Sequence, residues 1–93
     1  PGLDPRDFVD PSWDPLERSR VARHLSAGRV LASYRGMSWC RMGCDPGSGM
    51  GSRDLTDGVY VWPEGYVHYL LRHAVRPPAE FVRHALERSQ ARA

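Results

Sequence analysis

The 93-residue sequence predicts a single small α+β domain, residues 1–93, with an N-terminal helix, a β-meander of three to four short antiparallel strands, and two C-terminal helices packed on one sheet face. Apolar residues spaced three and four apart occur near both ends of the chain, as in amphipathic helices. Short runs rich in β-branched and aromatic residues occupy the middle, separated by glycine-containing turns. Strands do not alternate with helices, so a parallel sheet is not expected.

The first element is expected to be an extended arm over residues 1–13 that packs on the domain, because aromatic side chains accompany its prolines and aspartates. A helix is predicted over residues 14–27. Asp14 suits the N-cap and Pro15 suits the first helical position. Gly28 is expected to end the helix. The apolar side chains that should face the core are Val21, Ala22 and Leu25.

The middle of the chain, residues 29–62, is predicted to form the sheet. Residues 29–34 are typical of a strand, and residues 37–42 are expected to be its antiparallel partner. A glycine-rich loop should follow. Residues 52–56 and 59–62 are then predicted to form a second hairpin, because Asp57-Gly58 favours a two-residue type I′ turn.

The last part, residues 63–88, is predicted to hold two helices. A residue before proline prefers extended geometry, so Trp62 should end a strand and Pro63 should begin a helix with Glu64 in its first turn. A break is expected at Pro77-Pro78, and the polar tail from Glu87 is expected to fray. The predicted buried positions are Val67, Leu70, Leu71 and Ala74 in the first helix and Phe81, Val82, Ala85 and Leu86 in the second.

Composition indicates where such a chain occurs. All 13 basic residues are Arg, and the sequence has no Lys, Ile or Asn, which indicates a bacterial genome rich in G and C. This bias lowers the weight of the Arg count as a sign of function. No apolar run approaches the roughly 18 residues of a membrane span, and the first residues do not resemble a secretory signal. We therefore expect a cytoplasmic protein with reduced thiols.

Charge is unevenly distributed. Residues 1–17 carry five acidic side chains and one Arg, whereas residues 18–44 carry six Arg and no acidic side chain. The basic block over residues 18–41 could pair with the acidic arm and otherwise be solvated. With Tyr34 and Trp39 interleaved, it could instead bind single-stranded nucleic acid, whose bases stack on aromatic rings.

Two cysteines, Cys40 and Cys44, are the candidate metal ligands. Zinc knuckles use a C-x-x-C-G turn, and this pair is one residue wider. A cysteine turn followed by a hairpin and a helix is a zinc-site arrangement, so His68 is the expected third ligand. The candidates for the fourth ligand are Glu64, His73 and Asp45. His68 and His73 are five residues apart, roughly 140° around a helix, which predicts that one ion does not take both.

Catalysis has little support in the sequence. A cysteine and a histidine could act as nucleophile and base, but no third orienting residue is found at a recognisable spacing. The glycine-rich loop lacks the phosphate-binding motif. The enzyme question stays open, with a non-enzyme favoured. We therefore predict an accessory module that binds another protein, with no required cofactor and zinc as the alternative. The residues expected at its binding surface are Trp39, Arg41, Trp62, Glu64, His68 and Tyr69.

A longer pattern supports a bacterial origin. Ser38-Trp-Cys-Arg, followed by Thr56-Asp-Gly-Val-Tyr-Val-Trp-Pro-Glu-Gly-Tyr-Val-His-Tyr69, resembles a group of small proteins of high-GC bacteria, to which we assign no function. The resemblance covers about residues 7–86. It implies a C-x-x-C-G knuckle where this chain has Cys40-Arg-Met-Gly-Cys44, and the extra residue makes a shared metal site an open question.

Overall fold

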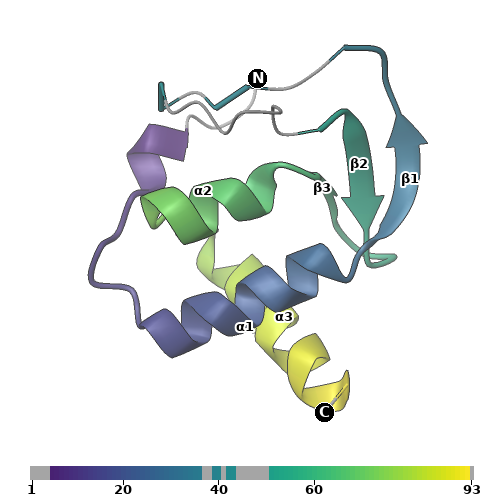
Figure 1. The fold of residues 1–93 in the computed structure, drawn as a ribbon. Coiled ribbons are helices and arrows are strands. Elements are labelled where there is room, and N and C mark those ends of the chain that lie inside the picture. The colour runs from purple at the N-terminus through teal and green to yellow at the C-terminus, as the bar shows by residue number, and fades with distance from the viewer. Residues whose placement is uncertain (1–4, 37–38, 41, 44–50, 93) are drawn as a thin grey trace.

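The computed structural model describes residues 5–36, 39–40, 42–43 and 51–92. Within these residues three α-helices gather beside a three-stranded antiparallel sheet, which confirms the predicted α+β class (Figure 1). The elements in chain order are the short 3-10 helix η1 (Pro5–Phe8), α1 (Pro15–Ser26), β1 (Arg29–Ser33), β2 (Arg53–Thr56), β3 (Val61–Pro63), α2 (Tyr66–His73) and α3 (Ala79–Arg92).

Helix α1 begins as predicted. The Asp14 carboxylate accepts a hydrogen bond from the Glu17 N–H at 3.3 Å, which satisfies one of the free donors of the first turn. Gly28 has a different role from the predicted one, because Ala27 caps the helix in right-handed geometry. A Cβ at Gly28 would lie 2.6 Å from Cζ2 of Trp62. Gly28 is therefore required by the close packing of α1 on β3.

The order of the sheet is β1-β2-β3, so β2 is the central strand. The prediction that residues 37–42 pair with residues 29–34 is wrong, because β1 pairs with β2. Of the expected partner, the described residues 39, 40 and 42 are not in a strand. Cys40 is instead buried against Tyr69 and Val75, away from the sheet. An apolar thiol side chain thus packs under α2 rather than extending the meander.

The hairpin between β2 and β3 exists, but its turn is longer than predicted. The last pair is Thr56 with Val61, so the loop has four residues and is not a type I′ turn. The Asp57 side chain explains the difference: Oδ1 accepts hydrogen bonds from the N–H groups of Val59 and Tyr60, each at 2.9 Å. A carboxylate that caps the loop replaces the backbone pairing that a two-residue turn needs.

Helix α2 starts at Tyr66, later than predicted, because Pro63 is part of β3 and pairs with Asp54. Glu64 does not occupy the first helical turn. Its Oε1 accepts a hydrogen bond from the Ser52 N–H at 2.7 Å, and its Oε2 pairs with Arg53 at 3.1 Å. The carboxylate therefore ties the entrance of α2 to the start of β2.

The buried face of α2 is rotated relative to the predicted one. Leu70 is fully buried, whereas Leu71 is 55% exposed and Tyr69 is buried in its place. The reason is that the Tyr69 flank of the helix is covered by Phe8 and Cys40. The chain outside the helix therefore selects which of two possible apolar stripes is buried.

Helix α3 follows Pro77-Pro78 as predicted and buries Phe81, Val82 and Ala85. It continues to Arg92, beyond the predicted end at residue 88, and fraying from Glu87 stays a prediction. The tail is rich in Ala, Glu, Gln and Arg, which favour helix even without burial. No helix in the described residues is long and apolar enough to cross a membrane.

Two clusters of buried side chains hold the elements together. The larger joins the three helices to β3 and contains Trp13, Val21, Ala22, Leu25, Trp62, Leu70, Phe81, Val82 and Ala85. The smaller contains Cys40, Tyr69 and Val75, with Phe8, Met42 and Tyr66 packed against it. The smaller cluster lies beside the candidate site.

Candidate metal centre

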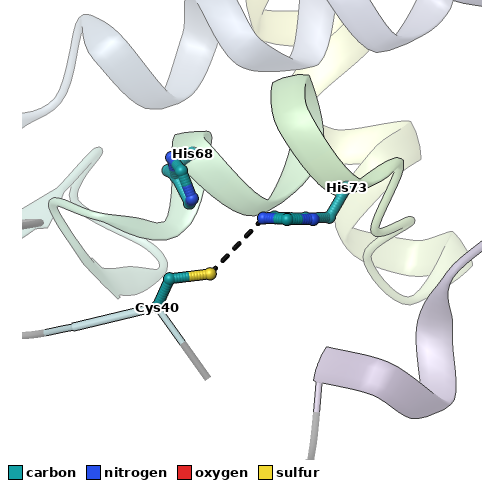
Figure 2. Close-up of side chains that lie close together, drawn as sticks. All are labelled: Cys40, His68 and His73. Carbon is teal, nitrogen blue, oxygen red and sulfur yellow. Dashed lines mark hydrogen bonds between the residues drawn. The ribbon is translucent and has the colours of Figure 1, made fainter. Parts of the chain in front are cut away.

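Three potential metal ligands converge beside α2. Cys40 comes from the segment between β1 and β2, His68 lies near the start of α2, and His73 is its last residue. The sulfur of Cys40 and one ring nitrogen of each histidine all lie within 4.8 Å of one another. Figure 2 shows Cys40 facing the helix, with the His73 ring directed toward its sulfur.

The spacing of these atoms suits a tetrahedral ion. A zinc ion about 2.3 Å from sulfur and about 2.0–2.1 Å from nitrogen places those two ligand atoms roughly 3.5 Å apart. Sγ of Cys40 lies 3.4 Å from Nε2 of His73, as the dashed line in Figure 2 marks. This separation also allows a weak hydrogen bond between the thiol and the imidazole, since sulfur bonds are long. The pair is thus compatible with a shared metal or a shared proton.

His68 supplies the observation that favours a metal. Its Nε2 is buried and has no hydrogen-bond partner within the described part of the chain. A buried polar nitrogen without a partner costs free energy, so such atoms are rare unless a ligand or ion satisfies them. Burial first, and then the charges of His73 and Arg72, lower the pKa of His68. The neutral ring that results is the form that coordinates metals.

The other ligands predicted from the sequence have mixed outcomes. Cys44 and Asp45 lie outside the described residues. The carboxylate of Glu64 is engaged by Ser52 and Arg53 and lies outside the three-ligand group.

His68 and His73 lie closer together than their angle around the helix predicts. That one ion does not easily take both stays a prediction. The ring centroids of His68 and His73 are only 5.1 Å apart. The angle around a helix describes only the direction in which each side chain leaves the backbone. The imidazole rings lie farther out, and both rings are turned toward Cys40 in Figure 2.

The six residues predicted for a binding surface do not share one environment. Trp39 is 60% exposed, whereas Trp62 and Tyr69 belong to the two buried clusters. Glu64 and His68 are half-buried. Arg41 lies outside the described residues. The role of these residues in binding a partner stays a prediction.

A second group of potential ligands joins α1, the β2–β3 loop and α3. Nε2 of His24 and Nε2 of His84 each lie 2.7 Å from Oδ2 of Asp57. Two ligands across a tetrahedral zinc would be roughly 3.4 Å apart, so this shorter spacing indicates direct hydrogen bonds. The Asp57 side chain is only 2% exposed and that of His24 is fully buried. The group therefore acts as a structural clamp.

The same contacts shift the acidity of Asp57. Burial alone would raise the pKa of this carboxyl group, but hydrogen bonds from Tyr60 and Val59, and then from His24 and His84, outweigh burial. The pKa of Asp57 is therefore lowered from its ordinary value of 3.8. This clamp is not among the features predicted from the sequence. His24 lies three residues after Val21, on the apolar stripe of α1. A histidine at such a position is expected to be buried and to need a polar partner, and this is the only sign of the clamp in the sequence.

Comparison with known proteins gives no match to this chain among family models, curated proteins or solved structures.

Proposed function

We propose that this chain is a small zinc-binding domain in which the ion ties the segment around Cys40 to helix α2. The observation that carries the proposal is the convergence of one thiol and two imidazoles within 4.8 Å, with a buried His68 nitrogen that lacks a hydrogen-bond partner in the described chain. Thiolate and imidazole together favour zinc over magnesium or calcium, which prefer oxygen ligands. A reducing compartment such as the cytoplasm would keep the thiol available.

Cys44 is the proposed fourth ligand. Structural zinc sites are usually four-coordinate and use two to four cysteines, and Cys44 follows Cys40 by only four residues. A complete set of four protein ligands would leave no open position for a substrate, so the ion would have a structural role. We therefore favour a non-catalytic domain.

The test is metal content, measured by mass spectrometry on protein that carries no histidine tag and has never met a chelator. We expect one zinc per chain in the wild type. Cys40→Ser, His68→Gln and His73→Gln should each lower zinc affinity by at least about tenfold. Loss of a residue that only hydrogen-bonds to a metal ligand typically costs about 10–100-fold, and loss of the ligand itself should cost more. His84→Gln is the matched control, because it removes an imidazole from the other histidine group and should leave the zinc content unchanged.

Thiol reactivity gives an independent readout of the same site. Bound zinc should protect the thiol of Cys40 from alkylation, and a chelator should expose it. A metal-free protein whose Cys40 alkylates rapidly at neutral pH would reject the zinc site.

Partner binding is the second candidate function, and exposed apolar side chains favour it. Val30 and Leu31 of β1 are 49% and 58% exposed, and Val61 of β3 is 55% exposed. A protein partner is expected to cover such side chains. Quantitative affinity capture with Leu31→Asp should lose proteins that the wild type retains, while Leu16→Asp, a change at another exposed leucine, should keep them. Identical captured sets for all three proteins would remove this candidate.

The nucleic-acid alternative rests on the basic block over residues 18–41, with Tyr34 and Trp39 interleaved. Within this block Arg20 and Arg23 of α1 and Arg29 of β1 are exposed. This alternative predicts that affinity for mixed single-stranded oligonucleotides falls steeply as salt rises. Fluorescence anisotropy at two salt concentrations tests it, and binding that does not depend on salt would reject it.

A further inference from the structure

The strand-like segment that follows α2 connects the candidate metal centre to the beginning of the described chain. His73 ends α2, and Ala74 next to it adopts the left-handed conformation with φ of 53°. Val75 then forms an isolated antiparallel bridge with Val9. One proposed metal ligand and this bridge are therefore only two residues apart.

The contacts across this bridge form a continuous set. The Asp10 N–H donates to the Ala74 carbonyl at 2.9 Å, and the Arg76 N–H donates to the Phe8 carbonyl at 2.8 Å. The Arg76 guanidinium pairs with the Asp10 carboxylate at 3.0 Å. These hydrogen bonds hold residues 5–10, here called the N-terminal segment, on residues 74–76.

Packing makes a second connection between the same two places. Phe8 of the N-terminal segment packs against the small buried cluster that contains Cys40 and Tyr69. Cys40 is itself a proposed ligand, so the segment packs on a cluster that includes one ligand and is also bonded to the residues that follow α2. Figure 1 shows η1 lying beside the end of α2.

We propose that metal bound by Cys40, His68 and His73 keeps the N-terminal segment docked, and that loss of the metal releases it. This inference rests on the proposed function. The ion would fix the positions of His73 and of Cys40, a member of the cluster on which Phe8 packs. Both supports of the segment would then be organised together. Without the ion the segment would depend on one bridge, a few hydrogen bonds and a small cluster, and such regions open first.

Release should be local. Trp13, just beyond the segment, is 2% exposed and belongs to the larger cluster, as does Val21 of α1. Those residues do not touch the metal centre through the contacts above. Metal loss is therefore expected to free residues 5–10 while α1 stays packed.

Hydrogen exchange of the full chain, followed by mass spectrometry or NMR with and without zinc, tests the proposal. We expect chelation to speed exchange of the Asp10 and Arg76 amides by at least about fivefold, the lower end of typical coupling between sites. The amides of α1 from Val21 to Leu25 should change much less and serve as the internal control. Zinc binding without faster exchange at Asp10 and Arg76 after chelation would overturn this inference and leave the proposed zinc site standing.

Linkage supplies a second test that leaves every ligand in place. If the metal favours docking, then docking must favour the metal by the same factor. Arg76→Ala removes the pair with Asp10 and the contact of the guanidinium with the Trp13 ring. It should weaken zinc affinity several-fold in competition with a chelator. Arg83→Ala, a change at an exposed arginine of α3, is the matched control and should leave the affinity unchanged. Equal affinities for the two variants would contradict the coupling, whereas absence of zinc binding in the wild type would overturn the proposed function itself.

Discussion

Oδ2 of Asp57 and Nε2 of His24 lie 2.7 Å apart, and this contact joins the loop between two strands to the buried face of helix α1. His84 approaches the same oxygen at the same distance from helix α3. A single buried carboxylate thus links three elements that are far apart in the sequence. Because buried polar groups are costly without partners, the position of each element depends on the other two.

Replacing Asp57 by Asn should lower the free energy of unfolding by about 2–4 kcal/mol, because the charge that both imidazoles contact is lost from a buried site. Urea unfolding of wild type and variant measures the difference. Asp54→Asn is the control: its Oδ2 accepts a hydrogen bond from the Tyr34 hydroxyl at an exposed position, and we expect a loss below about 1 kcal/mol. Similar losses in both variants would contradict the clamp.

Stability should fall in acid partly because of Asp57. Its pKa is lowered in the fold from the ordinary value of 3.8, so its contribution is present above that pH and is lost as the pH falls below it. The expected slope from this group is at most about 1.4 kcal/mol per pH unit. Urea unfolding between neutral pH and pH about 3 should show a steeper decline for wild type than for Asp57→Asn. If the free energy of unfolding fell equally with pH in wild type and Asp57→Asn, the acid sensitivity would belong to other carboxyl groups.

Gly28→Ala should destabilise the domain by about 1–3 kcal/mol through overpacking. The added Cβ would lie 2.6 Å from the ring of Trp62 and 3.1 Å from Cβ of Leu55. Thermal unfolding measures the effect. At Gly36, where φ is +86° and no described residue beyond its chain neighbours comes within 4 Å of an added Cβ, alanine should cost only the backbone strain of roughly 1 kcal/mol or slightly more. A smaller loss at Gly28 than at Gly36 would show that α1 and β3 are packed less closely.

Ala74→Gly should stabilise the domain slightly, by up to about 1 kcal/mol. Alanine in left-handed geometry is strained by roughly 1–2 kcal/mol, and the greater freedom of glycine in the unfolded chain offsets part of the relief. Ala74 has φ of 53° at the end of α2. Ala32→Gly in β1 is the opposite control and should lose about 0.5–1 kcal/mol, because glycine weakens a strand. Denaturant unfolding of the two variants should therefore shift in opposite directions.

Several local features could be predicted from the sequence because they depend on neighbouring residues. The capping of α1 by Asp14 and the break at Pro77-Pro78 are examples. The apolar stripes of α1 and α3 also follow from spacing alone, since a helix repeats every 3.6 residues. The same local reasoning failed at Asp57-Gly58, because a side chain of the turn itself offered the backbone a better set of hydrogen bonds.

The candidate site could be predicted from the sequence only in part. The residue types of Cys40 and His68 make them candidate ligands, and His73 is among the candidates for the fourth position. The structure brings these three side chains together. The helix angle between the two histidines predicts a wider separation, because it ignores the reach of the rings. The clamp around Asp57 was missed entirely, since nothing near His24 or His84 in the sequence shows that α1 and α3 meet at one loop.

The sequence by itself determined the α+β class, the order of helices and strands, and the residue types available for a metal. Tertiary structure alone decided the partner of β1, the buried face of α2, and which side chains meet at Cys40 and at Asp57. The physical reason is the range of the interactions involved. Caps, turns and helix stripes arise within a few residues. Strand pairing, burial and ligand convergence join residues roughly 20 to 70 positions apart, and the bridge between Val9 and Val75 lies near the upper end of this range.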